Sequence, residues 1–163
     1  MRLQGKVMNK ARILIAGGGI GGLVTALALI QRGFEVYVYE QAPELREFGA
    51  GVSITPNGSR VLIELGLQLE LEQVASRPIS WAMRLFNTGE SWQRPGSGAA
   101  LPPAVWVVHR ADLHQALAMA LEERAPGSVR VGARCVAFEQ NSGAVTLVLN
   151  NGEGVRGDVL ETV

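Results

Sequence analysis

Three glycines carry the clearest chemical signal in the sequence. Gly17, Gly19 and Gly22 stand in the spacing G-x-G-x-x-G, between an Ile-rich apolar run and a segment with helical periodicity. The first glycine permits a tight strand-to-helix turn, the second lets a pyrophosphate approach the backbone, and the third lets the helix pack closely on the strand. The N–H groups and the positive dipole end at the start of the helix suit an anionic phosphate. The spacing therefore predicts a nucleotide-binding turn.

Glu40 ends the next apolar run, about twenty residues beyond the glycines, where a carboxylate can accept hydrogen bonds from both hydroxyls of a ribose. A glutamate here, in place of an arginine, argues against a 2′-phosphate, so FAD or NAD fits better than NADP. Because glycines alone can also form a purely structural turn, the prediction depends on the order strand, turn, helix, strand and acid. Ala26 and Gly33 resemble the longer fingerprint of the two-dinucleotide-domain flavoproteins, which favours FAD.

The elements that must position these residues follow from the pattern of apolar side chains. Residues 11–16 predict a strand buried on both faces, and residues 20–31 predict a helix that Gly33 ends. Residues 35–40 predict a second strand, rich in β-branched and aromatic side chains. Strand, helix and strand in this order make a right-handed parallel crossover. The expected fold class is α/β, with a parallel sheet that starts with this βαβ unit.

Two further helices and a β-rich remainder are expected downstream. One helix should begin at Pro56, with Asn57 available as its N-cap and with Val61, Leu62 and Leu65 on its buried side. Another should open at Arg110, with Asp112 at its positive end. Turn signals separate the strands near the end of the chain and indicate a β-meander. The strands expected are residues 79–87, 105–108, 129–131, 134–139, 145–149 and 155–160.

Composition argues against several classes of function. Fifteen basic and fifteen acidic residues leave no net charge, so neither nucleic acid nor a membrane surface is an expected partner. Cys135 is the only cysteine, which excludes an internal disulfide and fits a cytoplasmic protein. His109 and His114 lack acids at ligand spacing, so we interpret them as ordinary helix-start residues and expect no metal. Residues 1–10 are expected to be a disordered or non-native extension.

Three further stretches resemble the FAD-dependent aromatic-ring monooxygenases of the salicylate hydroxylase and 4-hydroxybenzoate hydroxylase type. They are residues 49–57, 108–117 and 157–160, and with the glycine turn they follow the order of that family. The resemblance implies a Rossmann-like FAD-binding domain over residues 11–163, incomplete, with part of the substrate-domain excursion at about 79–108. It also implies FAD as cofactor, NADH or NADPH as co-substrate with O2, and a small aromatic substrate.

The same resemblance implies a site. Val52 lies where the family's loop passes the flavin, Arg110 matches an arginine that reaches the cofactor, and the strand that holds Val136 lies near the adenine. Arg110 can instead form an ion pair with a neighbouring acid. Arg46 can contact the ribose or phosphates, or simply be a solvated loop residue. No catalytic residue is predicted, and the predicted cofactor-binding residues are Gly17, Gly19, Ile20, Gly21, Gly22, Glu40, Gln41, Val52, Arg110 and Val136.

The sequence departs from the family's pattern at its end. In the family, the strand that here reads 157–160 continues into Ile-Gly-Ala-Asp-Gly, whereas this chain ends with Glu161, Thr162 and Val163. We therefore expect the truncated N-terminal part of a monooxygenase, inactive by itself and completed by a homo-oligomer or a complementing chain. Two other functions stay open: a non-catalytic fragment that binds FAD weakly or not at all, and an NAD-binding module.

Overall fold

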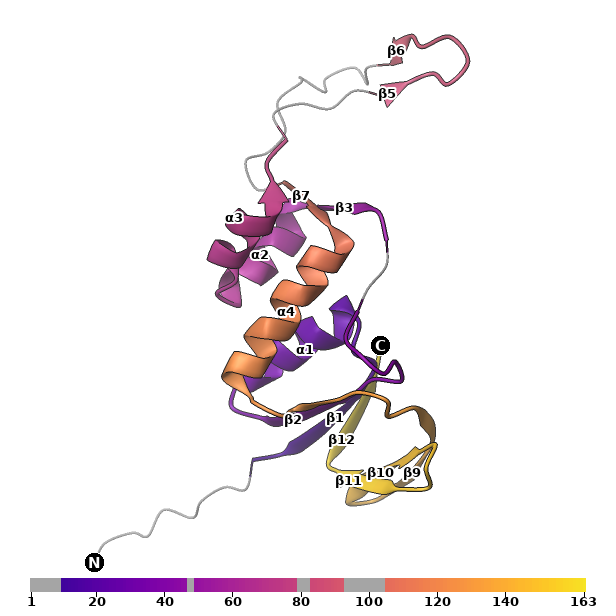
Figure 1. Ribbon diagram of the computed structural model, residues 1–163. Helices are drawn as coiled ribbons and strands as arrows, with labels where there is room; N and C mark the ends of the chain where they lie inside the picture. The colour runs from indigo at the N-terminus through magenta and orange to yellow at the C-terminus, as the bar shows by residue number, and fades with distance from the viewer. Residues whose placement is uncertain (1–9, 47–48, 79–82, 93–104) are drawn as a thin grey trace, which may run out of the picture. The chain divides into compact units, whose positions relative to one another are not determined.

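The Ile-rich run of the sequence forms β1 (Arg12–Ala16), an inner strand of a parallel sheet in the computed structural model (Figure 1). The sheet has the order β12-β1-β2-β8, and all three pairings are parallel. The other strands are β2 (Glu35–Tyr39), β8 (Val129–Arg130) and β12 (Val159–Thr162). The central residues of β1 are buried, as expected for a strand covered on both faces. The structure describes residues 10–46, 49–78, 83–92 and 105–163.

Helix α1 (Ile20–Gln31) connects β1 to β2 and confirms the predicted strand–helix–strand unit. Its buried face consists of small and branched residues that include Leu23, Ala26 and Leu27, each fully buried. Gly33 adopts a φ of +86° just after the helix, in the left-handed region that ends helices. Figure 1 places α1 on one side of this sheet.

A β-meander covers the opposite face of the parallel sheet. Its strands are β9 (Cys135–Asn141), β10 (Ala144–Leu149) and β11 (Gly154–Gly157), paired antiparallel in the order β11-β10-β9. A core cluster joins the two layers, which explains why the meander lies against β1 and β2. The predicted α/β fold class with a β-meander is thus confirmed. The buried members of the cluster are Leu14, Tyr39, Ala133, Leu147 and Leu149.

The single strand predicted at residues 155–160 is wrong, because the chain changes sheets at Asp158. The backbone N–H of Arg12 donates to Asp158 Oδ2 at 2.6 Å, and the N–H of Asp158 donates to Arg12 O at 2.8 Å. Gly157 makes the passage possible, since a Cβ there would lie 2.6 Å from Cγ of Leu14. β11 therefore ends in the antiparallel sheet and β12 begins in the parallel one.

The chain divides into two compact units, the first formed by residues 1–47 and 114–163 and the second by residues 48–113. The elements above belong to the first unit. The second holds an antiparallel sheet of order β3-β7-β4, a two-stranded hairpin, two short helices and the start of α4, which runs on into the first unit. These elements are β3 (Gly51–Ile54), α2 (Pro56–Glu64), α3 (Gln68–Val74), β4 (Ala75–Ser76), β5 (Met83–Arg84), β6 (Ser91–Trp92), β7 (Trp106–His109) and α4 (Arg110–Arg124).

Two predictions about α2 are wrong. Thr55 is the N-cap and Pro56 takes the first helical position, so Asn57 lies inside the helix. Proline prefers that position because its missing N–H would have no helical partner there. Val61 is 45% exposed, whereas Leu62 and Leu65 are buried as predicted.

Several other predictions fall partly outside the described residues. Of the extension predicted at residues 1–10, only Lys10 is described. Of the strand predicted at 79–87, residues 79–82 lie outside, and β5 contains only Met83 and Arg84. The excursion predicted at about 79–108 includes residues 93–104, also outside, and it stays a prediction. Among the described residues, no helix is both long and apolar enough to cross a membrane.

Packing of the meander on the sheet should dominate the stability of the first unit. Leu147 is 2% exposed and belongs to the core cluster, so Leu147→Ala should lower the free energy of unfolding by about 2–4 kcal/mol. Leu69, 70% exposed on α3, provides the matched control, and Leu69→Ala should change it by less than about 0.5 kcal/mol. Urea unfolding followed by circular dichroism measures both. Equal effects of the two substitutions would contradict the packing described.

Glu35 should make stability depend on pH. Tyr37 OH donates to its Oε1 at 2.8 Å and Arg12 Nη2 lies at 3.2 Å, and these contacts, that of Tyr37 first, hold the pKa of Glu35 below its ordinary value. The stabilisation is therefore present above the unfolded-state pKa and lost as pH falls through the lower folded-state pKa.

Glu35→Gln should accordingly be less stable than the wild type at pH 7, by less than about 1 kcal/mol because the pair is partly exposed. The difference should shrink as the pH falls from 7 through the folded-state pKa of Glu35. Urea midpoints across this pH range provide the measurement, with Glu139→Gln on β9 as the exposed control. A difference that does not change with pH would rule out the linkage.

Candidate functional site

The glycine turn joins the carboxyl end of β1 to the start of α1. Gly17 adopts a φ of +122°, and its N–H donates to Tyr39 O at 2.9 Å, which ties the turn to the end of β2. Gly19 is the N-cap of α1, and the helical ladder begins where Leu23 N–H donates to Gly19 O at 3.0 Å. The N–H groups before Leu23 have no partner within the helix, which is the arrangement that binds phosphates.

Three positions of the turn require glycine because there is no space for a Cβ. A Cβ on Gly22 would lie 2.0 Å from Gly17 O, and a Cβ on Gly17 would lie 2.5 Å from Val163 O. A Cβ on Gly18 would lie 2.9 Å from both Glu40 Cβ and Leu45 Cδ2. The G-x-G-x-x-G pattern leaves the position of Gly18 unspecified, so the pattern did not identify this third requirement.

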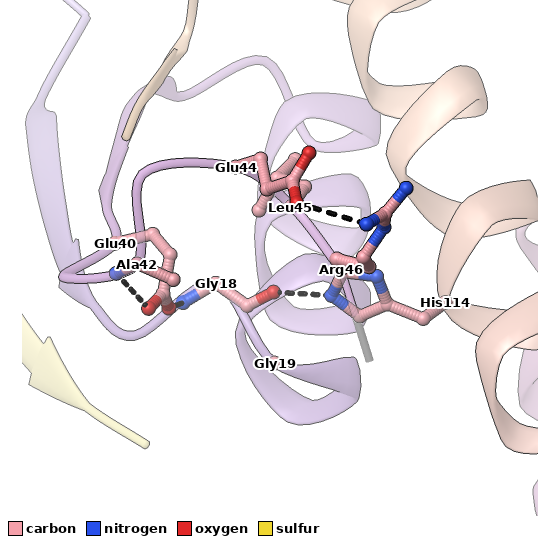
Figure 2. Close-up of a pocket in the computed structure, with 8 residues that line it drawn as sticks. All are labelled: Gly18, Gly19, Glu40, Ala42, Glu44, Leu45, Arg46 and His114. Carbon is pink, nitrogen blue, oxygen red and sulfur yellow. Dashed lines mark hydrogen bonds and ion pairs between the residues drawn. The ribbon is translucent and has the colours of Figure 1, made fainter. Parts of the chain in front are cut away.

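The carboxylate of Glu40 is fixed by two backbone N–H groups. Gly18 N–H donates to Oε2 at 2.6 Å, and Ala42 N–H donates to Oε1 at 2.8 Å (Figure 2). A carboxylate oxygen has two acceptor sites, so each oxygen keeps one for a further donor. The side chain is thus oriented and can still accept from ribose hydroxyls.

His114 contacts the turn from α4. It is 3% exposed, and its Nε2 lies 2.7 Å from Gly18 O (Figure 2). The interpretation of His114 as an ordinary helix-start residue is therefore wrong: its side chain is buried against the glycine turn. No local pattern predicts this contact, because the two residues are 96 positions apart in the sequence.

Two cavities flank Glu40 at the carboxyl ends of β1 and β2, where sheets of this kind bind ligands. One, of about 80 Å³, is shown in Figure 2 and lies between the turn, His114 and the loop after β2. The other, of about 210 Å³, lies between the turn, the loop after β2 and the start of β9. The larger cavity is lined by Ala16, Gly17, Tyr39, Glu40, Gln41, Ala133, Arg134, Cys135 and Val163.

Two side chains that line these cavities, those of Cys135 and Arg46, have surroundings that require no role in catalysis or binding. Burial raises the pKa of the Cys135 thiol, so the thiol stays protonated near neutral pH and is a poor nucleophile. Arg46 lines the smaller cavity, is 64% exposed, and forms an ion pair with Glu44 at 3.2 Å.

Seven of the ten predicted cofactor-binding residues surround the turn in the first unit. Val136 also lies in the first unit, 55% exposed on β9 and next to Cys135 of the larger cavity. Val52 and Arg110 belong to the second unit, where Arg110 N–H donates to Ala50 O at 3.3 Å. Contact with a cofactor stays a prediction for all ten. The seven at the turn are Gly17, Gly19, Ile20, Gly21, Gly22, Glu40 and Gln41.

Comparison with known proteins gives consistent matches along nearly the whole chain. A family model described as "FAD binding domain" matches residues 10–160. The 3-amino-4-hydroxybenzoate 2-monooxygenase of Streptomyces platensis is 38% identical over 159 residues, which cover 93% of this chain and 39% of that protein. Salicylate hydroxylase of Pseudomonas putida is 37% identical over 163 residues, covering 91% of this chain and 35% of that protein.

Solved structures agree with the sequence relatives. The tetrameric form of 2-methyl-3-hydroxypyridine-5-carboxylic acid oxygenase matches with a TM-score of 0.77 and 30% identity, over 94% of this chain and 39% of that chain. The chain therefore spans 35–39% of the length of these three relatives.

Because Gly22 lies so close to the carbonyl of Gly17, alanine substitutions at different glycines of the turn should affect the stability unequally. Gly22→Ala should destabilise the protein by about 2 kcal/mol or more, because the new Cβ would meet the Gly17 carbonyl at 2.0 Å. Gly21 is the matched control: a Cβ there would meet nothing closer than 3.9 Å, and alanine favours the helix. Gly21→Ala should therefore be neutral or stabilising by up to about 1 kcal/mol. Thermal unfolding measures the stability of both variants. An equal loss of stability in the two would contradict the steric constraint at Gly22.

Proposed function

The chain belongs to the FAD-binding domain family of the FAD-dependent aromatic-ring monooxygenases, and on this premise we propose that it binds FAD at the glycine turn. The resemblance stated from the sequence is thereby confirmed. The observation that carries the proposal is the cradle of Gly18, Gly22 and Glu40. The two glycines leave no space for a side chain, and the carboxylate is held in place by the backbone.

Each part of the ADP half has a place in this geometry. The N–H groups at the start of α1 suit the diphosphate, because they lack helical partners and lie at the positive end of the helix dipole. The free acceptor sites of Glu40 suit the ribose hydroxyls. The cavity of about 210 Å³ beside Gln41 and Cys135 suits the adenine, and Val136 follows directly on the same strand.

For the flavin half we propose Val52 and Arg110. Both lie close to the glycine-rich stretch that begins at Gly49: a Cβ there would meet Arg110 Cδ at 3.4 Å, and β3 begins two residues later. A guanidinium presents five fixed donors, which suits anionic oxygens.

The complete protein is proposed to hydroxylate a small aromatic substrate. FAD, when bound, supplies the redox chemistry with NAD(P)H and O2, while this chain's residues bind and orient the cofactor. The named relatives act on 3-amino-4-hydroxybenzoate and salicylate, which are small aromatic acids. Because the chain spans 35–39% of these relatives, we propose that residues 1–163 hold the cofactor without completing the reaction. The proposed partner is a second copy of the protein or a complementing chain, in the cytoplasm.

The test is a cofactor titration of residues 1–163. The purified chain is stripped of free flavin and titrated with FAD, following the flavin absorbance and fluorescence, and NADH with a hydroxybenzoate is then added. We expect saturable FAD binding without rapid NADH oxidation. A chain that takes up no FAD would refute the proposal in favour of a non-binding fragment. A chain that binds NADH and ignores FAD would favour an NAD-binding module.

Glu40 should be needed for affinity. Glu40→Gln keeps the shape but leaves one acceptor oxygen for two backbone N–H groups, so the affinity for FAD and ADP should fall roughly tenfold or more. Glu123→Gln, an exposed substitution on α4, should leave the affinity within about twofold. Isothermal titration calorimetry with ADP and fluorescence titration with FAD measure both variants. Unchanged affinity in Glu40→Gln would mean that the ribose binds elsewhere.

A further inference from the structure

His114 is the one histidine that contacts the glycine turn, and nothing in the proposed function uses it. We propose that His114 is a positioning residue for the diphosphate: it fixes the peptide between Gly18 and Gly19 so that Gly19 N–H faces the ligand. The inference rests on the proposed function and adds to it a residue from α4, far from the glycine motif in the sequence.

The chemistry of the contact defines the state of the imidazole. A carbonyl oxygen only accepts hydrogen bonds, so Nε2 of His114 must carry the proton that it donates to Gly18 O at 2.7 Å. The ring is 3% exposed, and water therefore has little access to replace the bond if it is lost. A buried carbonyl left without a donor is costly, which gives the contact an energetic role as well as a geometric one.

The backbone N–H and the backbone carbonyl of Gly18 are both hydrogen-bonded to side chains. Its N–H donates to Glu40 Oε2 at 2.6 Å, and its carbonyl accepts from His114 at 2.7 Å. Glycine backbones have wide conformational freedom, so these two bonds supply the restraint that a side chain would otherwise give. In a trans peptide the C=O and the following N–H point in opposite directions. With the Gly18 carbonyl turned toward His114, the N–H of Gly19 points away from that histidine.

The proposed roles of Glu40 and His114 differ in which part of the ligand they affect. The carboxylate of Glu40 has acceptor sites for ribose hydroxyls, which adenosine, ADP and FAD all carry. The restraint by His114 acts on a backbone N–H at the helix start, which suits the phosphate groups that ADP and FAD carry and adenosine lacks. Loss of the His114 donor should therefore lower the affinity for diphosphate ligands selectively. A general loss of structure would lower the affinity for every ligand alike.

The variants that test this are His114→Leu, which removes the donor, and His114→Gln, whose amide can donate from near the position of Nε2. His109→Leu is the matched control at the other histidine, which is exposed. ADP and FAD affinity should fall about tenfold in His114→Leu, recover to within about threefold in His114→Gln, and stay unchanged in His109→Leu. Adenosine affinity should change less than about twofold in all three. If His114→Leu does not fold, His114→Asn, with a shorter side chain, replaces it.

A second measurement uses the ligand-free protein. The sequence has two histidines, so ¹⁵N-labelled imidazole spectra can be assigned with the His109 variant. We expect His114 with its proton on Nε2, and a shifted Gly19 amide signal in His114→Leu that returns toward the wild type in His114→Gln.

The possible failures are distinguishable. A neutral ring with its proton on Nδ1 alone would overturn the inference, because Nε2 could then not donate to Gly18. Equal ADP affinity in the wild type and His114→Leu would overturn it while leaving the proposed function intact. If His114→Leu loses affinity for adenosine and for ADP alike, the inference is overturned, because His114 then supports the structure and not the diphosphate. A wild type that binds neither FAD nor ADP would refute the proposed function, and the ligand role of His114 with it.

Discussion

The structure of the site depends on one close backbone contact, that between the carbonyl of Gly17 and the Cα of Gly22. No side chain fits between them, since a Cβ on Gly22 would lie 2.0 Å from that oxygen. The contact sets the start of α1 directly over the end of β1, so the N–H groups of the first helical turn are presented at the carboxyl edge of the sheet. Gly17 also donates to Tyr39 O, which brings the end of β2, and with it Glu40, to the same edge.

A turn made of glycines needs restraint from outside itself. Ordering one residue's backbone costs about 1–2 kcal/mol, and glycine loses the most freedom. Two side chains offset this cost at Gly18: Glu40 from the end of β2 and His114 from α4. Hydrogen bonds to charged groups contribute about 1.5–3 kcal/mol each, so the bond to Glu40 is comparable to the cost of ordering one residue. The turn is thereby prepared for a ligand by residues outside the glycine motif.

The sequence predicted those features of fold and site that arise from neighbouring residues. The βαβ unit follows from apolar periodicity over residues 11–40, and the glycine spacing and Glu40 follow from the geometry of that same unit. The change of sheet at Asp158 could not be predicted, because alternation along a strand is the same in both sheets. Nor could the contact of His114 with Gly18, since the two residues are 96 positions apart in the sequence.

The two halves of the proposed cofactor site depend on different parts of the chain. The ADP half is proposed to need the turn, Glu40 and the larger cavity, which all belong to the first unit. Hydrogen bonds of 2.6–2.9 Å connect the turn to Glu40 and to the end of β2. The flavin half is assigned to Val52 and Arg110 of the second unit. We therefore propose that one compact unit binds the nucleotide, whereas the residues proposed for the flavin belong to the other unit.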